Sequence, residues 1–144
     1  MPIRCEIVSQ DRMVFEGDAD IIVVPGVNGE MGILPHHAPL LSTLGFGILK
    51  VRYQGEEEVF AISGGVIEVQ PTIVTVLADA AENVMEIDIS RAEAAKQRAE
   101  QMLKEGPPSD SDAYEAIEKQ LRKSQLRLQA AQRYRRQRPP TPTE

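Results

Sequence analysis

The sequence predicts two parts, an N-terminal antiparallel flattened β-sandwich followed by a C-terminal antiparallel two-helix hairpin. Three observations support this prediction. Up to about residue 86, short apolar segments are separated by turn signals at intervals of about eight to twelve residues, a spacing typical of antiparallel sandwiches. From residue 88 onward, alanines and other apolar residues recur every three or four positions, which is the helical period. The sequence Gly106-Pro107-Pro108 then ends the first helix, because proline lacks an amide donor.

The sandwich is predicted to occupy residues 1–86, which contain no helical pattern of ten residues. The alternation in GILKVRY, residues 47–53, is typical of a half-buried strand with one wet face. Asn28-Gly29 is a strong hairpin-turn signal. The strand candidates are 5–9, 13–17, 20–24, 47–53, 58–62, 66–70 and 73–78.

The hairpin is predicted for residues 87–137, with helices at about 89–105 and 112–135, and the proline-rich residues 138–144 are expected to be disordered. The helices carry stripes of small residues at Ala92, Ala95, Ala99, Ser124 and Ala131, among larger ones. An alanine buries much less apolar area than a leucine, so this seam is expected to be weak and the hairpin able to open.

Composition excludes several classes of function. Cys5 is the only cysteine, which rules out an internal disulfide, and His36-His37 are the only histidines, so no metal site is expected. Phosphate-loop, dinucleotide-binding, zinc-protease and nucleophile-elbow motifs are missing, so we expect no catalytic residues and no enzyme activity for the isolated chain. No apolar run approaches the roughly 20 residues of a membrane span, and MPIRCEIV has no signal-peptide core, so membrane association is expected only through partners.

Charge is distributed unevenly along the chain. Residues 1–87 carry 4 basic and 13 acidic residues, a net charge of −9, whereas residues 88–144 carry 12 basic and 9 acidic ones, a net charge of +3. Residues 119–138 hold eight basic residues and no acidic one. This pattern indicates an acidic partner, either nucleic acid or an acidic protein surface, unless the basic residues are only a solvated helix face. With no Trp and only six aromatic residues, stacking sites for single-stranded nucleic acid are scarce.

The junction between the two parts, IDISRAEAAK at residues 87–96, allows two interpretations. In the first, the junction only starts a helix, with Asp88 as N-cap or with Ser90 as N-cap and Glu93 completing a capping box. In the second, Arg91 and Arg98 lie on one helix face and bind phosphates, while Asp88 accepts hydrogen bonds from an adenine or an arginine.

Three stretches together resemble the epsilon subunit of the bacterial F-type ATP synthase, called delta in mitochondria. They are NGEMGILPHHAPLL (28–41), AISGGVIEVQPTIVTVLADAAE (61–82) and IDISRAEAAKQRAEQML (87–103), and the resemblance covers about residues 2–131. It implies a sandwich of about ten strands, followed by a two-helix hairpin.

The resemblance also implies a non-catalytic rotor subunit, peripheral to the cytoplasmic face of the bacterial plasma membrane. The implied partners are the gamma subunit, the ring of c subunits, and the beta and alpha subunits. The sandwich would couple proton-driven rotation of the ring to the central stalk, and the hairpin would inhibit ATP hydrolysis when it extends. The alternative function is a nucleic-acid-binding module that uses residues 119–138.

Site residues follow from the same resemblance. No cofactor is required, but ATP is expected as a possible regulatory ligand of the folded-down hairpin. Rotor contact is expected from Glu30 and His37 in the 28–40 loop. The expected ATP-binding residues are Glu82, Ile87, Asp88, Arg91, Ala92, Arg98, Lys123 and Arg127, and the expected inhibitory basic face is Arg122, Lys123, Arg127, Arg133, Arg135 and Arg136.

Overall fold

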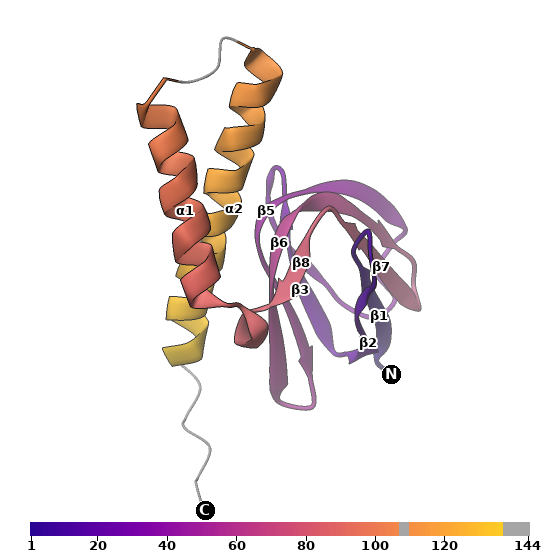
Figure 1. The fold of residues 1–144 in the computed structure, drawn as a ribbon. Coiled ribbons are helices and arrows are strands. Elements are labelled where there is room, and N and C mark those ends of the chain that lie inside the picture. Colours follow the sequence, from indigo (N-terminus) through magenta and orange to yellow (C-terminus); the bar gives the residue numbers. More distant parts are fainter. Residues whose placement is uncertain (107–109, 137–144) are drawn as a thin grey trace, which may run out of the picture. The chain divides into compact units, whose positions relative to one another are not determined.

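The computed structural model describes residues 1–106 and 110–136, and the chain divides into two compact units, Met1–Asn83 and Val84–Glu144. The first unit is a β-sandwich and the second is a helical hairpin (Figure 1). The sandwich strands are β1 (Ile3–Val8), β2 (Met13–Ala19), β3 (Ile21–Gly26), β4 (Gly29–Ile33), β5 (Leu40–Tyr53), β6 (Glu56–Val69), β7 (Ile73–Ala78) and β8 (Ala81–Asn83).

The described strands form one eight-stranded sheet with the order β2-β1-β7-β6-β5-β3-β4, and β8 also pairs with β6. Most pairs are antiparallel, but β1 and β7 are parallel, with Cys5 opposite Val74. The expected antiparallel β-sandwich is therefore confirmed, except that this one parallel pair makes the sheet mixed. Apolar alternation identifies a strand and its buried face, but it does not specify which neighbour the strand pairs with.

The strand count also differs from the expected ten or so. Strands β5 and β6 are each 14 residues long and pair with each other along their whole length. Counting each of these long strands as two shorter ones would turn eight into ten. The Gly64-Gly65 pair, expected to separate two strands, lies inside β6, where both glycines have positive φ values of 87° and 138°. A Cβ on Gly65 would meet the Leu77 carbonyl oxygen at 2.3 Å, so only glycine fits there.

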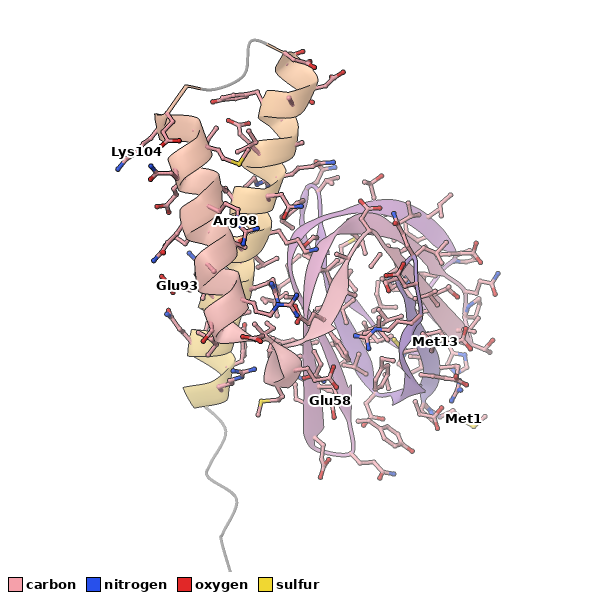
Figure 2. All side chains as sticks on the ribbon, in the orientation of Figure 1. Met1, Met13, Glu58, Glu93, Arg98 and Lys104 are labelled. Carbon is pink, nitrogen blue, oxygen red and sulfur yellow. The ribbon has the colours of Figure 1, made fainter. Side chains whose placement is uncertain are left out.

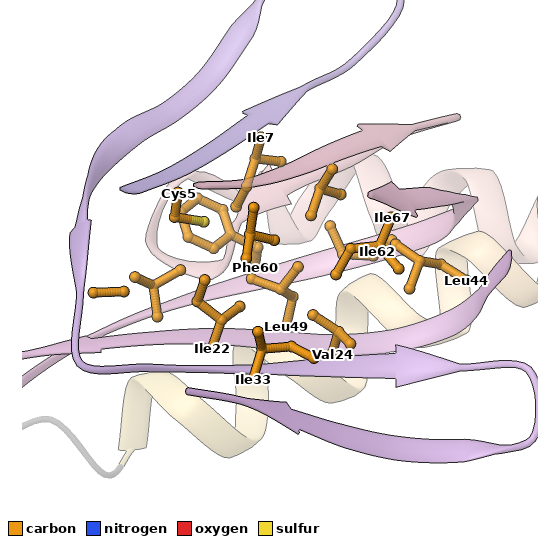
Figure 3. Close-up of a cluster of buried hydrophobic side chains, with 14 of the residues drawn as sticks. Cys5, Ile7, Ile22, Val24, Ile33, Leu44, Leu49, Phe60, Ile62 and Ile67 are labelled. Atoms are coloured by element: carbon orange, nitrogen blue, oxygen red, sulfur yellow. The ribbon is translucent and has the colours of Figure 1, made fainter. Parts of the chain in front are cut away.

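The core of the sandwich consists of the inward-facing side chains of the alternating strands (Figure 3). In β1, Ile3, Cys5 and Ile7 are buried and the residues between them are not. Phe60 is the largest fully buried side chain, and its ring meets that of Phe15 edge-to-face at 5.5 Å between centroids. Burial raises the pKa of the Cys5 thiol to about 12, so Cys5 stays protonated and acts as a small apolar core residue.

The helical unit begins with a short 3-10 helix, η1 (Val84–Glu86), followed by α1 (Ile89–Lys104) and α2 (Ser111–Arg136). The two α-helices pack against each other and α2 also contacts η1, so η1 belongs to this unit although the sandwich was expected to extend to residue 86. Asp110 caps α2 by accepting a hydrogen bond from the Asp112 amide at 2.9 Å. The expected disordered tail, residues 138–144, lies outside the described residues.

Packing in the hairpin is tighter at one end than at the other. Near the start of α1 and the end of α2 the small residues Ala92 and Ala131 are buried beside Leu128. Ser124, at the middle of α2, is also buried, and its hydroxyl donates to the Gln120 carbonyl at 2.9 Å. Toward the interhelix connection, Met102 is 49% exposed. The stripe of small residues thus brings the helices close together mainly at the base of the hairpin, the end opposite the connection.

Candidate functional site

The first turn of α1 decides which residue caps the helix. Asp88 is the N-cap: its backbone is extended, its Oδ1 accepts a hydrogen bond from the Arg91 amide at 3.0 Å, and its carbonyl accepts one from the Ala92 amide at 3.0 Å. Ser90 lies inside the helix, so the alternative cap does not form. The Asp88 carboxylate therefore already has a structural role, worth about 1 kcal/mol for a typical N-cap.

The two arginines of α1 lie seven residues apart, two helical turns, and so occupy nearly the same face. Arg98 lies on the side of α1 toward α2, whereas Glu93 and Lys104 lie on the outer side (Figure 2). Both Arg91 and Arg98 are exposed, which leaves their guanidinium groups accessible to an anion.

The antiparallel arrangement of the helices brings Lys123 and Arg127 to the same level as Arg91. Two observations fix this alignment: Arg98 faces the region of Ile117 and Gln120, and Arg135 reaches the residues just before α1. The stretch of α2 between these points contains Lys123 and Arg127, both half-buried. The four expected phosphate-binding cations, Arg91, Arg98, Lys123 and Arg127, therefore lie at neighbouring levels of the two helices of one hairpin.

The remaining expected ATP-binding residues have other surroundings. Ile87 and Ala92 are buried, at 2% and 0% exposure. Glu82 belongs to the sandwich unit, where it pairs with Ala61 in the β6–β8 ladder. The eight residues are thus divided between the two units, with seven in the helical hairpin.

A cavity of about 250 Å³ opens between the helices, near their connected ends. Arg98 and Gln120 are its polar lining residues, and the rest of the lining is apolar. The apolar lining consists of Ala95, Ala99, Met102, Ala116 and Ile117. Small side chains leave this space unfilled, so the contacts that hold the helices together here are few.

The expected inhibitory basic residues do not form a single face. Arg122 and Arg133 are exposed and lie eleven residues, about three turns, apart, so they share one side of α2. Arg135 is half-buried and bonded to two backbone carbonyls. The side chain of Arg136 lies outside the described residues. The exposed pair, Arg122 and Arg133, is therefore the part of the set best placed to meet a partner.

The expected rotor-contact residues lie on the sandwich. Glu30 is exposed on β4, opposite Pro25 of β3. His37 lies in the turn before β5, where its Nδ1 donates to the Ala38 carbonyl at 2.8 Å and its amide donates to the Leu34 carbonyl at 3.2 Å. His36 precedes it with a φ of 65°, so the two histidines are part of a turn and not of a strand.

Sequence reasoning missed an apolar row on the outer face of the sandwich. The apolar cross-strand neighbours Met13, Val8, Leu77 and Val66 line up across β2, β1, β7 and β6, and the exposed Thr43 of β5 ends the row. Met13, Leu77 and Val66 are 47%, 55% and 39% exposed. At about 4.8 Å per strand, this outer row extends about 19 Å. The row could not be recognised in the sequence, because each strand contributes only one residue to it.

Neither metal ligation nor membrane insertion is evident in residues 1–106 and 110–136. No group of three His, Cys, Asp or Glu side chains there is placed to hold a metal ion. None of the helices in this part of the chain is both long and apolar enough to cross a membrane.

Comparison with known proteins matches the two units to two family models. Residues 2–84 match the beta-sandwich domain of the ATP synthase delta/epsilon chain, and residues 85–132 match its long alpha-helix domain. Two relatives named ATP synthase epsilon chain are similar over most of their length. The one from Dehalococcoides mccartyi strain BAV1 is 44% identical over 134 residues, covering 93% of this chain and 95% of the relative. The one from Acidithiobacillus ferridurans is 42% identical over 137 residues, covering 95% and 96%.

Solved structures agree with this result. A chain in the Euglena gracilis mitochondrial ATP synthase, in a structure of OSCP, F1 and the c-ring, superposes with a TM-score of 0.74 at 26% identity. That match covers 91% of this chain and 81% of the other. A chain from the central stalk and c-ring of the Tetrahymena thermophila enzyme has a TM-score of 0.62 at 14% identity, covering 91% and 97%, and so shows the shared fold.

Proposed function

The chain belongs to the delta/epsilon family of ATP synthase subunits, which are non-catalytic parts of that enzyme, and we propose that it works as a rotor subunit of the central stalk. The family match across both units is the observation that carries this proposal. In the proposed role the sandwich binds the gamma subunit and the ring of c subunits at the cytoplasmic face of a bacterial plasma membrane. The hairpin regulates ATP hydrolysis by the alpha and beta subunits. The family descriptions name no nucleic acid, and we do not propose nucleic-acid binding.

Gamma is proposed to dock on the outer row of the sandwich. The row offers exposed apolar side chains at Met13, Leu77 and Val66, which a protein partner would bury. The c ring is proposed to contact the 28–40 loop through Glu30 and His37, which lie outside the row. These two surfaces would let the sandwich transmit rotation from the ring to gamma.

Co-purification from native membranes tests the rotor role. A tagged wild-type chain should bring down gamma, beta and the c ring. Leu77→Asp puts a charge in the middle of the outer row and should lose most of the gamma, because an unpaired carboxylate would have to be buried at the interface. Glu30→Ala combined with His37→Ala should keep gamma and weaken c-ring recovery.

Each variant should first be checked for a wild-type urea midpoint, since the substituted side chains are not part of the core. Failure of the wild-type chain to recover any ATP synthase subunit would contradict the rotor role. Full gamma binding by Leu77→Asp would contradict only the docking surface.

ATP is proposed to bind the closed hairpin beside the first turn of α1. The support is the group of cations on neighbouring levels of the two helices, Arg91, Arg98, Lys123 and Arg127, next to the positive end of the α1 dipole. Such a ligand needs only modest affinity. Free ATP at ten times its dissociation constant would favour the closed state by about 1.4 kcal/mol, about a tenfold population shift.

Calorimetric titration of ATP into the isolated subunit tests this site. We expect binding at or below millimolar ATP in the wild type and at least tenfold weaker binding in Arg91→Ala. Arg122→Ala is the matched control, because this exposed arginine of α2 is not in the proposed set. Asp88→Ala should cost about 1 kcal/mol of stability with or without nucleotide, since it removes the N-cap. Absence of binding at millimolar ATP would leave Asp88 as a helix cap only.

Inhibition is proposed to come from the opened hairpin, whose basic residues would meet acidic residues of the beta subunits. Arg122 and Arg133 are the exposed pair on one side of α2 and carry this role best. Exposed ion pairs contribute only about 0–1 kcal/mol each, so several must act together and high salt should weaken them.

A further inference from the structure

Arg135, in the last turns of α2, is bonded to the segment that leads into α1. Its Nε donates to the Val84 carbonyl at 3.0 Å and its terminal nitrogen donates to the Ile87 carbonyl at 2.5 Å. These partners are 51 and 48 residues away in the sequence. The two bonds therefore join the far end of the hairpin to its beginning, entirely within the helical unit.

The geometry of the segment explains why one side chain can take both carbonyls. Val84 opens η1, one turn of 3-10 helix, and Ile87 follows directly after its last residue, so the two carbonyls lie about one turn apart in the chain. A guanidinium presents several donors in a rigid plane and can bond both oxygens at once, whereas a lysine ammonium acts as a point charge.

These bonds are not the ordinary interaction of a basic residue with its own helix end. A cation in the last turn commonly bonds the final carbonyls of the same helix or complements their dipole. The acceptors of Arg135 belong instead to η1 and to the residue before the Asp88 N-cap. Arg135 thus stabilises a tertiary contact, in addition to any effect on α2 itself.

Arg135 adds to a mixed apolar contact at the base of the hairpin. Val84, Ile87 and Leu128 are buried there together with the small residues Ala92 and Ala131, whereas near the connection the seam gives way to the cavity of about 250 Å³. Alanine burial contributes little apolar area, so the two hydrogen bonds from a charged donor are a substantial addition to what closes this end.

We propose that Arg135 is the latch of the hairpin: its guanidinium bridges the Val84 and Ile87 carbonyls, and the hairpin opens at its base only when both bonds break. The latch holds the segment that positions Asp88 and Arg91, so it also orders the first turn of α1. A guanidinium held in this way is not available to an acidic partner. Arg135 therefore joins the inhibitory set only after the latch has opened.

Hydrogen exchange of the isolated full-length subunit, without nucleotide, tests the latch. Arg135→Lys keeps the charge but loses the planar fork, and Arg135→Gln removes the charge. Hydrogen bonds from a charged donor contribute measurably to the free energy of local opening. We therefore expect hydrogen exchange at the Arg91 and Ala92 amides to become at least about tenfold faster in both variants. Far-UV circular dichroism should show unchanged helix content, because the helices themselves persist.

Arg133 provides the matched control two residues away. It is exposed, and its guanidinium lies over the Tyr134 ring at 5.4 Å to the centroid. Arg133→Lys and Arg133→Gln should leave the exchange of Arg91 and Ala92 within about twofold of the wild type. Wild-type exchange in Arg135→Lys, or equal acceleration in the Arg133 variants, would overturn the latch. Because no nucleotide or partner is present, these outcomes do not depend on the ATP site or the rotor role.

Discussion

Replacing Phe60 with alanine is expected to lower the free energy of unfolding of the sandwich by about 3–5 kcal/mol, the usual range for a buried phenylalanine. Phe60 is 1% exposed and meets Phe15 edge-to-face, so the substitution removes apolar burial, leaves a cavity and breaks an aromatic pair. Since small domains are commonly stable by only about 5–15 kcal/mol, this one change would remove a large part of the total.

Urea unfolding followed by tyrosine fluorescence measures this loss. Tyr53 is the sandwich tyrosine, so Tyr114→Phe and Tyr134→Phe provide a background in which fluorescence reports on that unit. With a denaturant slope of about 1–3 kcal/mol per molar urea, the midpoint should fall by more than about 1 M.

Leu41→Ala is the control for this experiment, because Leu41 is 70% exposed and should change stability by less than about 0.5 kcal/mol. Phe60→Leu should fall between the two. A loss of less than about 1 kcal/mol in Phe60→Ala would mean that the core is not packed around this ring.

The sequence predicted much of the sandwich because burial repeats with a period of two. In β1 the buried residues Ile3, Cys5 and Ile7 alternate with polar ones, and such a pattern can be recognised without neighbours. Strand β4, Gly29–Ile33, was not predicted, because its composition is rich in glycine and has little alternation. The Gly64-Gly65 pair was misassigned because glycines with positive φ are typical of turns, whereas here both lie inside a continuous strand.

The candidate site was predictable to a similar extent. The sequence pointed to Asp88 as a possible cap because N-caps use a short list of residue types, but it could not choose between Asp88 and Ser90. Bonds from Arg135 to Val84 and Ile87 were not foreseen, since the acceptors are backbone carbonyls and any residue type would supply them. The cavity was likewise invisible in the sequence, because it depends on how two helices are aligned and not on either helix alone.

Filling that cavity should close the hairpin and, if the open hairpin inhibits as proposed, raise ATP hydrolysis. Ala95→Leu adds three carbon atoms at a half-buried position that lines the space of about 250 Å³. Each buried methylene contributes about 0.8 kcal/mol. Even if the new side chain fills the cavity only in part, it should stabilise the closed state by about 1–2 kcal/mol, which raises the ratio of closed to open hairpin about five- to thirtyfold. In a reassembled ATP synthase at low ATP, hydrolysis should therefore rise severalfold relative to the wild type.

Ala94→Leu is the matched control, since Ala94 is exposed on the same helix turn and does not line the cavity. Both substitutions change the helix propensity equally, so a difference between them reports on the cavity. The isolated Ala95→Leu subunit should also show slower hydrogen exchange in both helices, whereas Ala94→Leu should not. Equal hydrolysis rates for the two variants would contradict the link between closure and release.

The same assay separates closure from charge. If the open hairpin inhibits through Arg122 and Arg133, the double variant Arg122→Ala/Arg133→Ala should itself raise hydrolysis, because it removes the exposed cations that meet the beta subunits. Adding Ala95→Leu to that background should then have little further effect, since closing a hairpin that no longer inhibits changes nothing. If the effects of Ala95→Leu and Arg122→Ala/Arg133→Ala on hydrolysis are fully additive, closure and charge act on separate steps. If the subunit with Arg122→Ala/Arg133→Ala still inhibits hydrolysis at low salt, inhibition comes from contacts other than these two charges.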